Sequence, residues 1–299
     1  MERIDVGIIG CGPAGLQAAI HSARKKATTT VFGKGKSSAI YPAHLENYAG
    51  LPGKTDGSAF IEAAIAQAES FGAAFVGENV IGASVAEGGF ALTVESGRTY
   101  LCASVVIATG NSRVKLGVPG EKEFFGKGVS YCASCDCNFY KGRTVAVVGC
   151  ESEAAASAEL MTSYASKVYW ICPGVEASKE MEAKALAAGA EMVASKVKEI
   201  HGGDRVAGLS LADGREIAVD GVFIELGAKS AADIAMDLDV MPNMDDSIPV
   251  DGDCMAAPGV FACGDVTGKP WQVAKAVGQG CVAGMAAADY AKGRADVLQ

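Results

Sequence analysis

The sequence predicts an α/β protein with two strand–loop–helix units of the nucleotide-binding type, the second inserted between the two parts of the first. A buried strand at residues 4–9 runs into the glycine-rich loop GCGPAG and then into an Ala-rich helix. A second unit of the same kind begins within residues 144–161, and the chain ends on another strand, loop and helix. With 38 glycines and only 7% aromatic residues, the composition suits a fold with many tight strand-to-helix turns.

The composition and charge narrow the class of protein. The chain has 299 residues, 49% of them hydrophobic, which is enough for one large domain or two ordinary ones. Lys and Arg number 26 against 35 Asp and Glu, so the formal charge of −9 argues against a nucleic-acid-binding protein. The first residues lack the pattern of a signal peptide, and no apolar run is long enough to span a membrane. We therefore expect a cytoplasmic protein.

The first unit begins with the chain. Residues 4–9 predict a buried strand, the loop Gly10–Gly15 follows, and residues 28–32 form the next strand after the helix. Gly12 lets the backbone approach a pyrophosphate, and the start of the helix supplies free N–H groups and a positive dipole end. Because the motif lies between a strand and a helix, its context is the one that dinucleotide binding requires. We expect a dinucleotide here rather than a merely tight turn.

The remaining elements continue the alternation of strands and helices. They are, in order, a helix over 57–71, strands near 74–76, 91–95 and 105–108, a linker over 111–124, a strand over 167–171, a helix over 177–188, strands over 206–211 and 222–225, a loop over 241–259, a strand over 259–265 and a final helix. The expected domains are residues 1–113 with 242–299, and residues 114–241 inserted between them.

Three of the ten cysteines form a cluster, whereas most of the others lie in apolar contexts and read as small buried hydrophobic residues. The spacing of Cys132 and Cys135 lets both sulfurs sit on one helical turn, close enough for a disulfide. A helix N-terminus there would lower the thiol pKa. The alternative is a zinc site that includes Cys137, but the sequence has no second Cys-x-x-Cys and its three histidines are scattered. The pattern favours a redox dithiol and no metal.

The second glycine-rich loop departs from its pattern. In G-x-G-x-x-A the second glycine leaves room for a pyrophosphate, but this chain has Glu151 there and Glu153 two residues later. Both carboxylates could instead satisfy the helix dipole, and in either case they repel a phosphate. The end of the next strand, residues 171–174, has no basic residue for a 2′-phosphate and no acid for a ribose. We expect NADPH to bind poorly or not at all.

Five motifs together resemble the low-molecular-weight thioredoxin reductase family: GCGPAG, ENYAG, VIATG, YCASCDCNFYKG and GVFACGDVTGKPWQVAKA. They span nearly the whole chain in the family's order. The resemblance implies a homodimer. Each chain would have two Rossmann-like (FAD/NAD(P)-binding) domains, with FAD in the discontinuous one. The chain is most similar to the ferredoxin-dependent flavin thioredoxin reductases, which lack the nicotinamide motifs.

The resemblance also implies a FAD site drawn from several segments. Its residues are Gly10, Gly12, Pro13, Ala14, Gly15, Gly33, Lys34, Asn47, Val80, Ala108, Thr109, Gly110, Gly264, Asp265, Gln272, Val273 and Ala274. In the family, the aspartate at position 265 accepts a ribityl hydroxyl, although it could also cap a helix. The helix that starts near Gln272 faces the pyrimidine edge of the flavin, where it would stabilise negative charge on the reduced ring.

Three departures from the family pattern fall near this site. Ser38, Ala39 and Ile40 stand where the family tends to have a Gly-Gly-Gln-Leu-like run, and the usual ribose-binding acid is absent. Lys34, together with Lys36, could then meet the adenosine side. Trp271 replaces a polar or basic residue, so it either stacks near the flavin or serves as a dimer contact or core aromatic.

Roles at the dithiol also follow from the resemblance. Cys135 would face the flavin, Cys132 would attack the partner's disulfide, and Asp136 would move the proton of the thiol step. Asp136 could alternatively be a helix-start carboxylate. Cys137 replaces a family glycine and is either an inert thiol or a third exchange partner.

The expected function is that of a FAD-dependent reductase of thioredoxin whose donor is ferredoxin or another carrier that is not NADPH. One alternative is an oxygen-using dithiol oxidase on the same scaffold. A second is a flavoprotein sensor or electron-transfer module with no thioredoxin partner. An NADPH-dependent enzyme with an unorthodox nucleotide site is a third.

Overall fold

A computed structural model describes residues 2–110 and 115–297. The chain divides into two compact units, the first made of Met1–Ser112 with Ser230–Gln299 and the second of Arg113–Lys229. The chain thus re-enters the first unit at Ser230, twelve residues before the expected position at 242. The reason is helix α6 (Ala231–Asp237), which the sequence did not indicate and which packs within the first unit's core.

An eight-stranded sheet forms the centre of the first unit. Its main path runs through β17 (Met255–Ala257), β18 (Val260–Ala262), β8 (Thr99–Ile107), β1 (Glu2–Ile9), β2 (Thr29–Phe32) and β5 (Ala74–Val76). All neighbours from β18 to β5 are parallel, and β7 (Gly89–Val94) joins β8 antiparallel together with β6 (Val80–Ala86). The loops after β1, β8 and β18 therefore meet at one edge of the sheet, where α/β proteins bind ligands.

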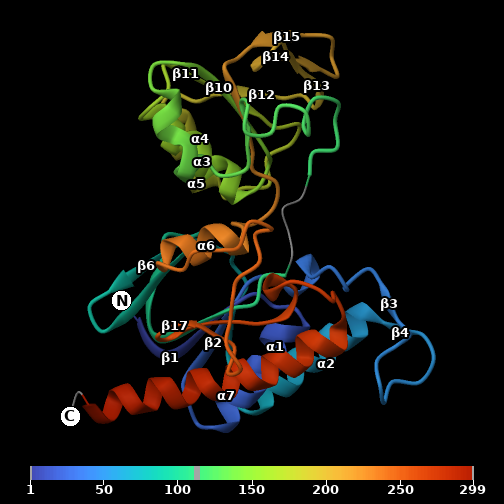
Figure 1. Ribbon diagram of the computed structural model, residues 1–299, viewed down its shortest axis with the longest axis vertical. Coiled ribbons are helices and arrows are strands. Elements are labelled where there is room, and N and C mark those ends of the chain that lie inside the picture. The colour runs from blue at the N-terminus through green and yellow to red at the C-terminus, as the bar shows by residue number, and fades with distance from the viewer. Residues whose placement is uncertain (1, 111–114, 298–299) are drawn as a thin grey trace. The chain divides into compact units, whose positions relative to one another are not determined.

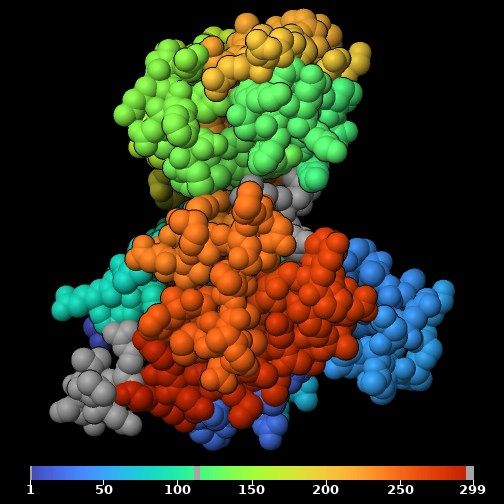
Figure 2. Space-filling model, in the orientation of Figure 1, coloured from blue at the N-terminus to red at the C-terminus, as the bar shows by residue number. Residues whose placement is uncertain are grey.

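Both faces of this sheet are buried, as a parallel sheet requires. Ile8 faces a core shared with α1 (Pro13–Arg24), α2 (Gly57–Ser70) and α7 (Val273–Val297), whereas Ile9 faces the core that α6 closes. Figure 1 shows α7 lying beside α1, and Figure 2 shows the C-terminal segment, orange to red, across a broad face of this unit. Short elements complete the unit: η1 (Gly35–Ser37), β3 (His44–Leu45), β4 (Thr55–Asp56) and η3 (Gly264–Thr267).

The close approach of α1 and α7 depends on two glycines. A Cβ on Gly280 would lie 2.2 Å from the Ala14 carbonyl oxygen, and one on Gly284 would lie 2.3 Å from that of Ala18. The two helix backbones therefore touch, which fixes the start of α7 against the glycine-rich loop. In the part of the chain that the structure describes, no helix combines the length and apolarity needed to cross a membrane.

The second unit has a five-stranded parallel sheet. Its strands are β12 (Glu191–Val193), β11 (Lys167–Ile171), β10 (Thr144–Val148), β16 (Gly221–Ile224) and β9 (Val129–Ser130). Its helices are α3 (Ala133–Asp136), η2 (Cys137–Tyr140), α4 (Ser152–Thr162) and α5 (Lys179–Ala187), and β13 (Val197–Gly202), β14 (Val206–Leu211) and β15 (Glu216–Ala218) form a separate antiparallel sheet. The expected strands at 167–171 and 206–211 coincide with β11 and β14, but the separate sheet was not foreseen.

Candidate functional site

The first glycine-rich loop has the shape of a phosphate cradle. Gly10 has a φ of 117°, and a Cβ there would lie 2.3 Å from the carbonyl oxygen of Ala108 at the end of β8. Gly12, the N-cap of α1, has no side chain that could cap the helix, and Pro13 is the first helical residue. The N–H groups at the start of this twelve-residue helix are thus left for an anion. A Cβ on Gly15 would lie 2.0 Å from the Gly10 carbonyl oxygen, which explains the third glycine.

The turn after β18 packs directly on this loop. Gly264 has a φ of 82°, and a Cβ there would lie 2.8 Å from the Cβ of Ala14. Residues 250 positions apart in the sequence are therefore neighbours, and Asp265 follows at once in η3. Burial raises the pKa of Asp265, and the positive charge of Lys275 partly opposes that shift. A half-buried carboxylate at this place can accept hydrogen bonds from a hydroxyl-bearing ligand.

Two side chains from α7 hold the η3 turn. The Lys275 ammonium donates to the carbonyl oxygens of Gly264 and Gly268 at 2.9 and 2.6 Å, and to Thr267 Oγ1 at 2.9 Å. Gln279 Oε1 accepts from the Gly264 N–H at 3.0 Å and from Thr267 Oγ1 at 2.9 Å. Neither residue was predicted from the sequence, although their i, i+4 spacing near the start of a helix places them on one face.

Asn47 and Gln272, both expected on the flavin side, are joined directly. Asn47 Nδ2 donates to Gln272 Oε1 at 2.8 Å across 225 residues of sequence. Val273 and Ala274 follow as the first residues of α7. Trp271 is 51% exposed, with Lys269 Nζ 5.2 Å from its ring centre, so it is not a core aromatic.

Two hydroxyl groups near the loops fit a bound cofactor. Thr109, next to Ala108 and Gly110 after β8, has a buried Oγ1 with no hydrogen-bond partner among the described residues. Ser38 Oγ lies 3.4 Å from the position of a Cβ on Gly12, so this hydroxyl faces the cradle. The sequence marked Ser38 only as a departure from a family pattern. A buried hydroxyl without a partner and a glycine cradle are what a phosphate- and hydroxyl-rich cofactor such as FAD would complete.

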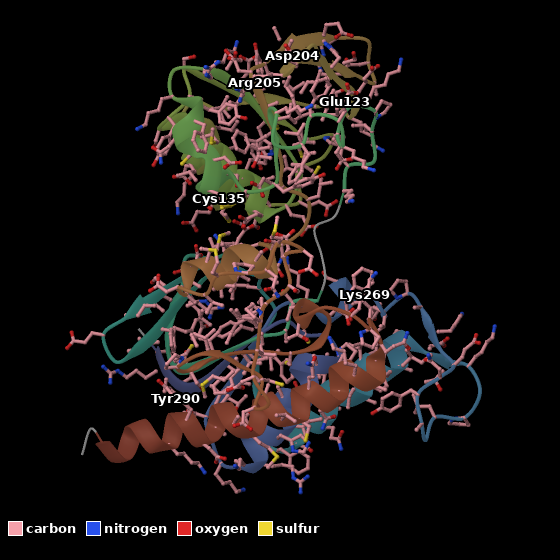
Figure 3. All side chains as sticks on the ribbon, in the orientation of Figure 1. Glu123, Cys135, Asp204, Arg205, Lys269 and Tyr290 are labelled. Atoms are coloured by element: carbon pink, nitrogen blue, oxygen red, sulfur yellow. A yellow bond between two sulfur atoms is a disulfide. The ribbon has the colours of Figure 1, made fainter. Side chains whose placement is uncertain are left out.

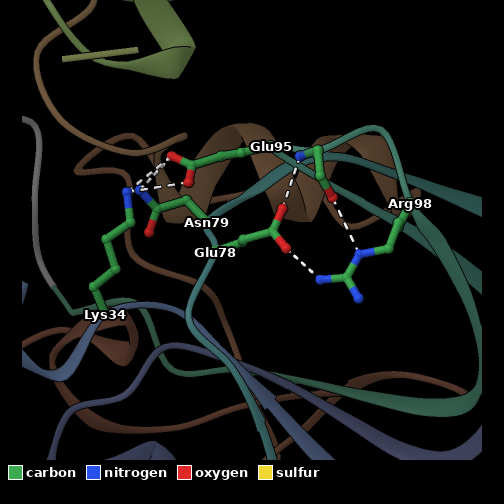
Figure 4. A network of polar contacts seen from close by, with 6 residues as sticks. Lys34, Glu78, Asn79, Glu95 and Arg98 are labelled. Atoms are coloured by element: carbon green, nitrogen blue, oxygen red, sulfur yellow. Dashed lines mark hydrogen bonds and ion pairs between the residues drawn. The ribbon is translucent and has the colours of Figure 1, made fainter. Parts of the chain in front are cut away.

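The expected adenosine side carries an ion-pair network (Figure 4). Lys34 Nζ lies 3.1 Å from Glu95 Oε2, and Asn79 Nδ2 donates to Glu95 Oε1 at 3.2 Å. The charge of Lys34 is therefore already balanced by a carboxylate. Gly33, with a φ of 129°, donates its N–H to the Val76 carbonyl at 3.0 Å. The Val80 side chain is 3% exposed and packs in the core, so only its backbone is left to meet a ligand.

The second unit places its dithiol at the carboxyl edge of its own sheet. Cys132 and Cys135 form a disulfide with 2.09 Å between the sulfurs. Cys132 is the N-cap of α3, its Sγ accepts from the Cys135 N–H at 3.2 Å, and its own N–H donates to Ser130 Oγ at 3.1 Å. Cys132 is buried, whereas Cys135, a residue of α3 that is labelled in Figure 3, is exposed.

Three side chains near this disulfide, those of Asp136, Cys137 and Glu225, differ in burial and in hydrogen bonding. Asp136 is half-buried on α3, one residue after Cys135. Cys137 is 3% exposed, its thiol donates to the Ser134 carbonyl at 3.6 Å, and its contact with the Tyr164 hydroxyl raises the pKa of that tyrosine. Glu225, which no sequence pattern singled out, accepts on Oε1 from the N–H of Ala133, the residue after Cys132, at 2.9 Å.

The second glycine-rich loop keeps the backbone of the first. Glu151 is the N-cap of α4 with φ −89° and ψ −179°, close to the −97° and −175° of Gly12. A Cβ on Gly149 would lie 2.0 Å from the Glu225 carbonyl oxygen, just as a Cβ on Gly10 would lie close to the Ala108 carbonyl oxygen. The N–H groups of Glu176 and Ala177 donate to the Cys150 carbonyl at 2.8 and 2.9 Å. The segment after β11 therefore lies against this loop, which carries two acids.

Comparisons with known proteins agree with this geometry. The model of the pyridine nucleotide-disulphide oxidoreductase family matches residues 4–280. The chain is 33% identical to a thioredoxin reductase of Aquifex aeolicus over 98% of its length and 95% of that protein. Among solved structures, the atypical thioredoxin reductase TRi of Desulfovibrio vulgaris Hildenborough is similar with a TM-score of 0.86 and 35% identity, over 97% of this chain and 98% of that one. A ferredoxin-flavin thioredoxin reductase of Clostridium acetobutylicum has a TM-score of 0.70 and 32% identity, with the same coverage.

Proposed function

Because the chain belongs to the pyridine nucleotide-disulphide oxidoreductase family, we propose that it is a FAD-dependent thioredoxin-disulfide reductase whose electron donor is not NADPH. The α/β fold with Rossmann-like domains and the FAD-binding character are properties of the family and its thioredoxin reductase members. One observation carries the finer proposal. A unit with an intact Cys132–Cys135 disulfide has Glu151 at the loop position where Gly12 stands in the other unit.

Different residues of the first unit would bind different parts of FAD. The N–H groups of the Gly10–Gly15 loop would bind its pyrophosphate, with the Ser38 hydroxyl beside Gly12. Asp265 would accept from a ribityl hydroxyl, and Thr109 Oγ1 would gain the partner it lacks among the described residues. When bound, FAD supplies a group that accepts electrons and passes a pair of them to a disulfide.

The dithiol residues carry out the exchange with thioredoxin. The Cys132 thiolate attacks one sulfur of the thioredoxin disulfide and releases the other as a thiolate, which forms a mixed disulfide. The Cys135 thiolate then attacks Cys132 Sγ, re-forms the disulfide and releases reduced thioredoxin. The Cys135 N–H, 3.2 Å from Cys132 Sγ, favours the thiolate of Cys132, and Asp136 would take and return the protons.

The proposed donor is a reduced iron–sulfur protein of the ferredoxin class. The likeness to a ferredoxin-flavin thioredoxin reductase supports this part of the proposal, as do the acids Glu151 and Glu153 at the start of α4. A one-electron carrier needs no phosphate-binding loop in the second unit, so these acids would cost such an enzyme nothing.

The direct test offers the purified protein NADPH, NADH or reduced ferredoxin under anaerobic conditions and measures reduction of thioredoxin. We expect turnover with ferredoxin and little with either nucleotide. Brisk turnover with NADPH at a micromolar KM would contradict the proposed donor. Rapid peroxide formation from a dithiol substrate in air, without thioredoxin reduction, would instead indicate a dithiol oxidase.

We also propose a homodimer in the cytoplasm. The eight cysteines other than the redox pair are free, which suits a compartment that keeps thiols reduced. Sedimentation of the FAD-bound protein tests the assembly, with a monomer at micromolar concentration as the contrary result.

A further inference from the structure

Glu225 places a buried carboxylate beside the redox disulfide. It follows β16, is only 6% exposed, and its Oε1 accepts from the Ala133 N–H at 2.9 Å. The parallel register explains the position. Phe223 on β16 pairs with Ser130 on β9, and Glu225 and Cys132 each lie two residues further along the chain, just beyond the ends of these strands.

The backbone of Glu225 is held on both sides of the residue. Its N–H donates to the Val148 carbonyl at 2.9 Å. Its own carbonyl oxygen lies 2.0 Å from the position that a Cβ on Gly149 would take, so the glycine-rich loop packs against it. A charged group costs free energy when buried unless hydrogen bonds hold it, and here one of those bonds is the first N–H of α3. The start of the dithiol helix is thus hydrogen-bonded to the Glu225 carboxyl group.

We propose that Glu225 is a positioning residue of the dithiol centre, which holds the start of α3 and favours the disulfide over the reduced pair. The inference rests on the proposed function, in that Cys132 and Cys135 are taken as the redox pair. Reduction adds two electrons and two protons to the disulfide and gives two thiols, one of which must become the attacking thiolate. Loss of a proton from Cys132 stabilises the reduced pair, and a carboxylate held at the Ala133 N–H disfavours that thiolate and thereby the reduced pair.

The consequence is a stronger reductant. A reduced state that is less stable gives up its electrons more readily, so the charge of Glu225 helps the pair to reduce thioredoxin. The other acids on the packed elements are Asp136 on α3, Glu151 and Glu153 at the start of α4, and Glu159 further along α4. They remain in place when Glu225 is changed, so their effect is common to all the variants compared.

The experiment measures the thiol–disulfide equilibrium of the FAD-bound full chain at pH 7. Wild type, E225Q and E225A are equilibrated anaerobically in graded dithiothreitol buffers and quenched in acid, and the free thiols of the Cys132–Cys135 peptide are counted by mass spectrometry. E225Q keeps an acceptor for the Ala133 N–H and removes only the charge. We expect it to shift the equilibrium about ten-fold toward the dithiol, or about 30 mV toward a less negative potential.

A matched control separates this effect from the loss of any buried acid. Glu121 is 5% exposed in the same unit and accepts the N–H groups of Leu116 and Gly117 at 2.8 and 2.6 Å. Glu121 also accepts from the Tyr131 hydroxyl at 2.7 Å, so it holds residues before Cys132 and not the start of α3. E121Q should therefore shift the equilibrium less than about two-fold. Near-UV spectra of each variant confirm the fold, and E225Q decides the matter if E225A does not fold.

The outcomes distinguish the two proposals. A wild-type potential in E225Q combined with a shifted one in E225A would mean that Glu225 acts only as a hydrogen-bond acceptor, and the inference would be overturned. Wild-type potentials in both variants would overturn it as well. If the wild-type pair itself takes up no electrons from the buffer, the proposed function fails first, and this inference fails with it.

Discussion

The two glycine-rich loops have almost the same backbone and opposite chemistry. Gly12 and Glu151 both cap a helix in an extended conformation. A Cβ added to Gly10 or to Gly149 would lie 2.3 or 2.0 Å from a carbonyl oxygen at the end of a neighbouring strand. Only the side chains differ, with none at position 12 and a carboxylate at position 151. The comparison shows that a nucleotide-type loop can keep its backbone geometry with a carboxylate at the position of the second glycine.

The largest expected effect concerns what the second unit has kept. Cys135→Ser should lower thioredoxin reduction by at least about a thousand-fold, since no resolving thiolate remains. It should also trap a mixed disulfide between Cys132 and thioredoxin, visible on a non-reducing gel. Cys132→Ser, the matched variant, should be equally inactive without trapping. Trapping by the Cys132→Ser protein instead would exchange the two roles, in line with the exposure of Cys135 in the structure.

Gly12→Glu makes the first loop like the second. The backbone at Gly12 is extended and a Cβ meets nothing closer than Ser38 Oγ at 3.4 Å, so the chain should still fold. We expect FAD affinity to fall by about a hundred-fold, because the carboxylate would face the pyrophosphate unpaired. Flavin absorbance of the purified protein measures the loss. Gly252→Glu, in an exposed loop with open space around the glycine, adds the same charge and should keep its flavin.

The reverse change, Glu151→Gly, makes the second loop like the first. Removing the carboxylate should strengthen NADPH binding by about ten-fold, or about 1.4 kcal/mol, as followed by calorimetry. The affinity should still be weak, because residues 171–174 offer no basic side chain for the 2′-phosphate. Full NADPH-dependent activity from this single substitution would show that the loop alone excluded the nucleotide.

The smallest expected effect concerns the support of the first site. Lys275→Met leaves the carbonyl oxygens of Gly264 and Gly268 without their ammonium donor. We expect FAD affinity to fall by about five-fold, a cost of about 1 kcal/mol. Lys292→Met on the same helix, where the ammonium donates to the Lys25 carbonyl away from η3, is the control. Equal FAD affinity in wild type and Lys275→Met would mean that Gln279 alone holds the turn.

Local patterns sufficed for the parts of the molecule that depend on neighbouring residues. The loop Gly10–Gly15, the strand at 167–171 and the dithiol follow from spacing and periodicity, so the sequence could predict them. The contacts of Glu225 with Ala133 and of Asn47 with Gln272 span 92 and 225 residues. They depend on strand register and helix packing, which no local pattern encodes, and Glu225 appeared in the sequence only as the end of a strand.

Burial gives the remaining thiols a consequence for the handling of this protein. It raises the pKa of Cys11 to about 11 and that of Cys102 to about 12, and it also raises the pKa of Cys263. These sulfurs stay protonated in neutral solution and react slowly with electrophiles. Cys150 and Cys281 are partly exposed and should be labelled in both redox states, so the difference in labelling between the oxidised and reduced protein should come from Cys132 and Cys135. The number of alkylated thiols per chain would then report whether the Cys132–Cys135 pair is oxidised or reduced.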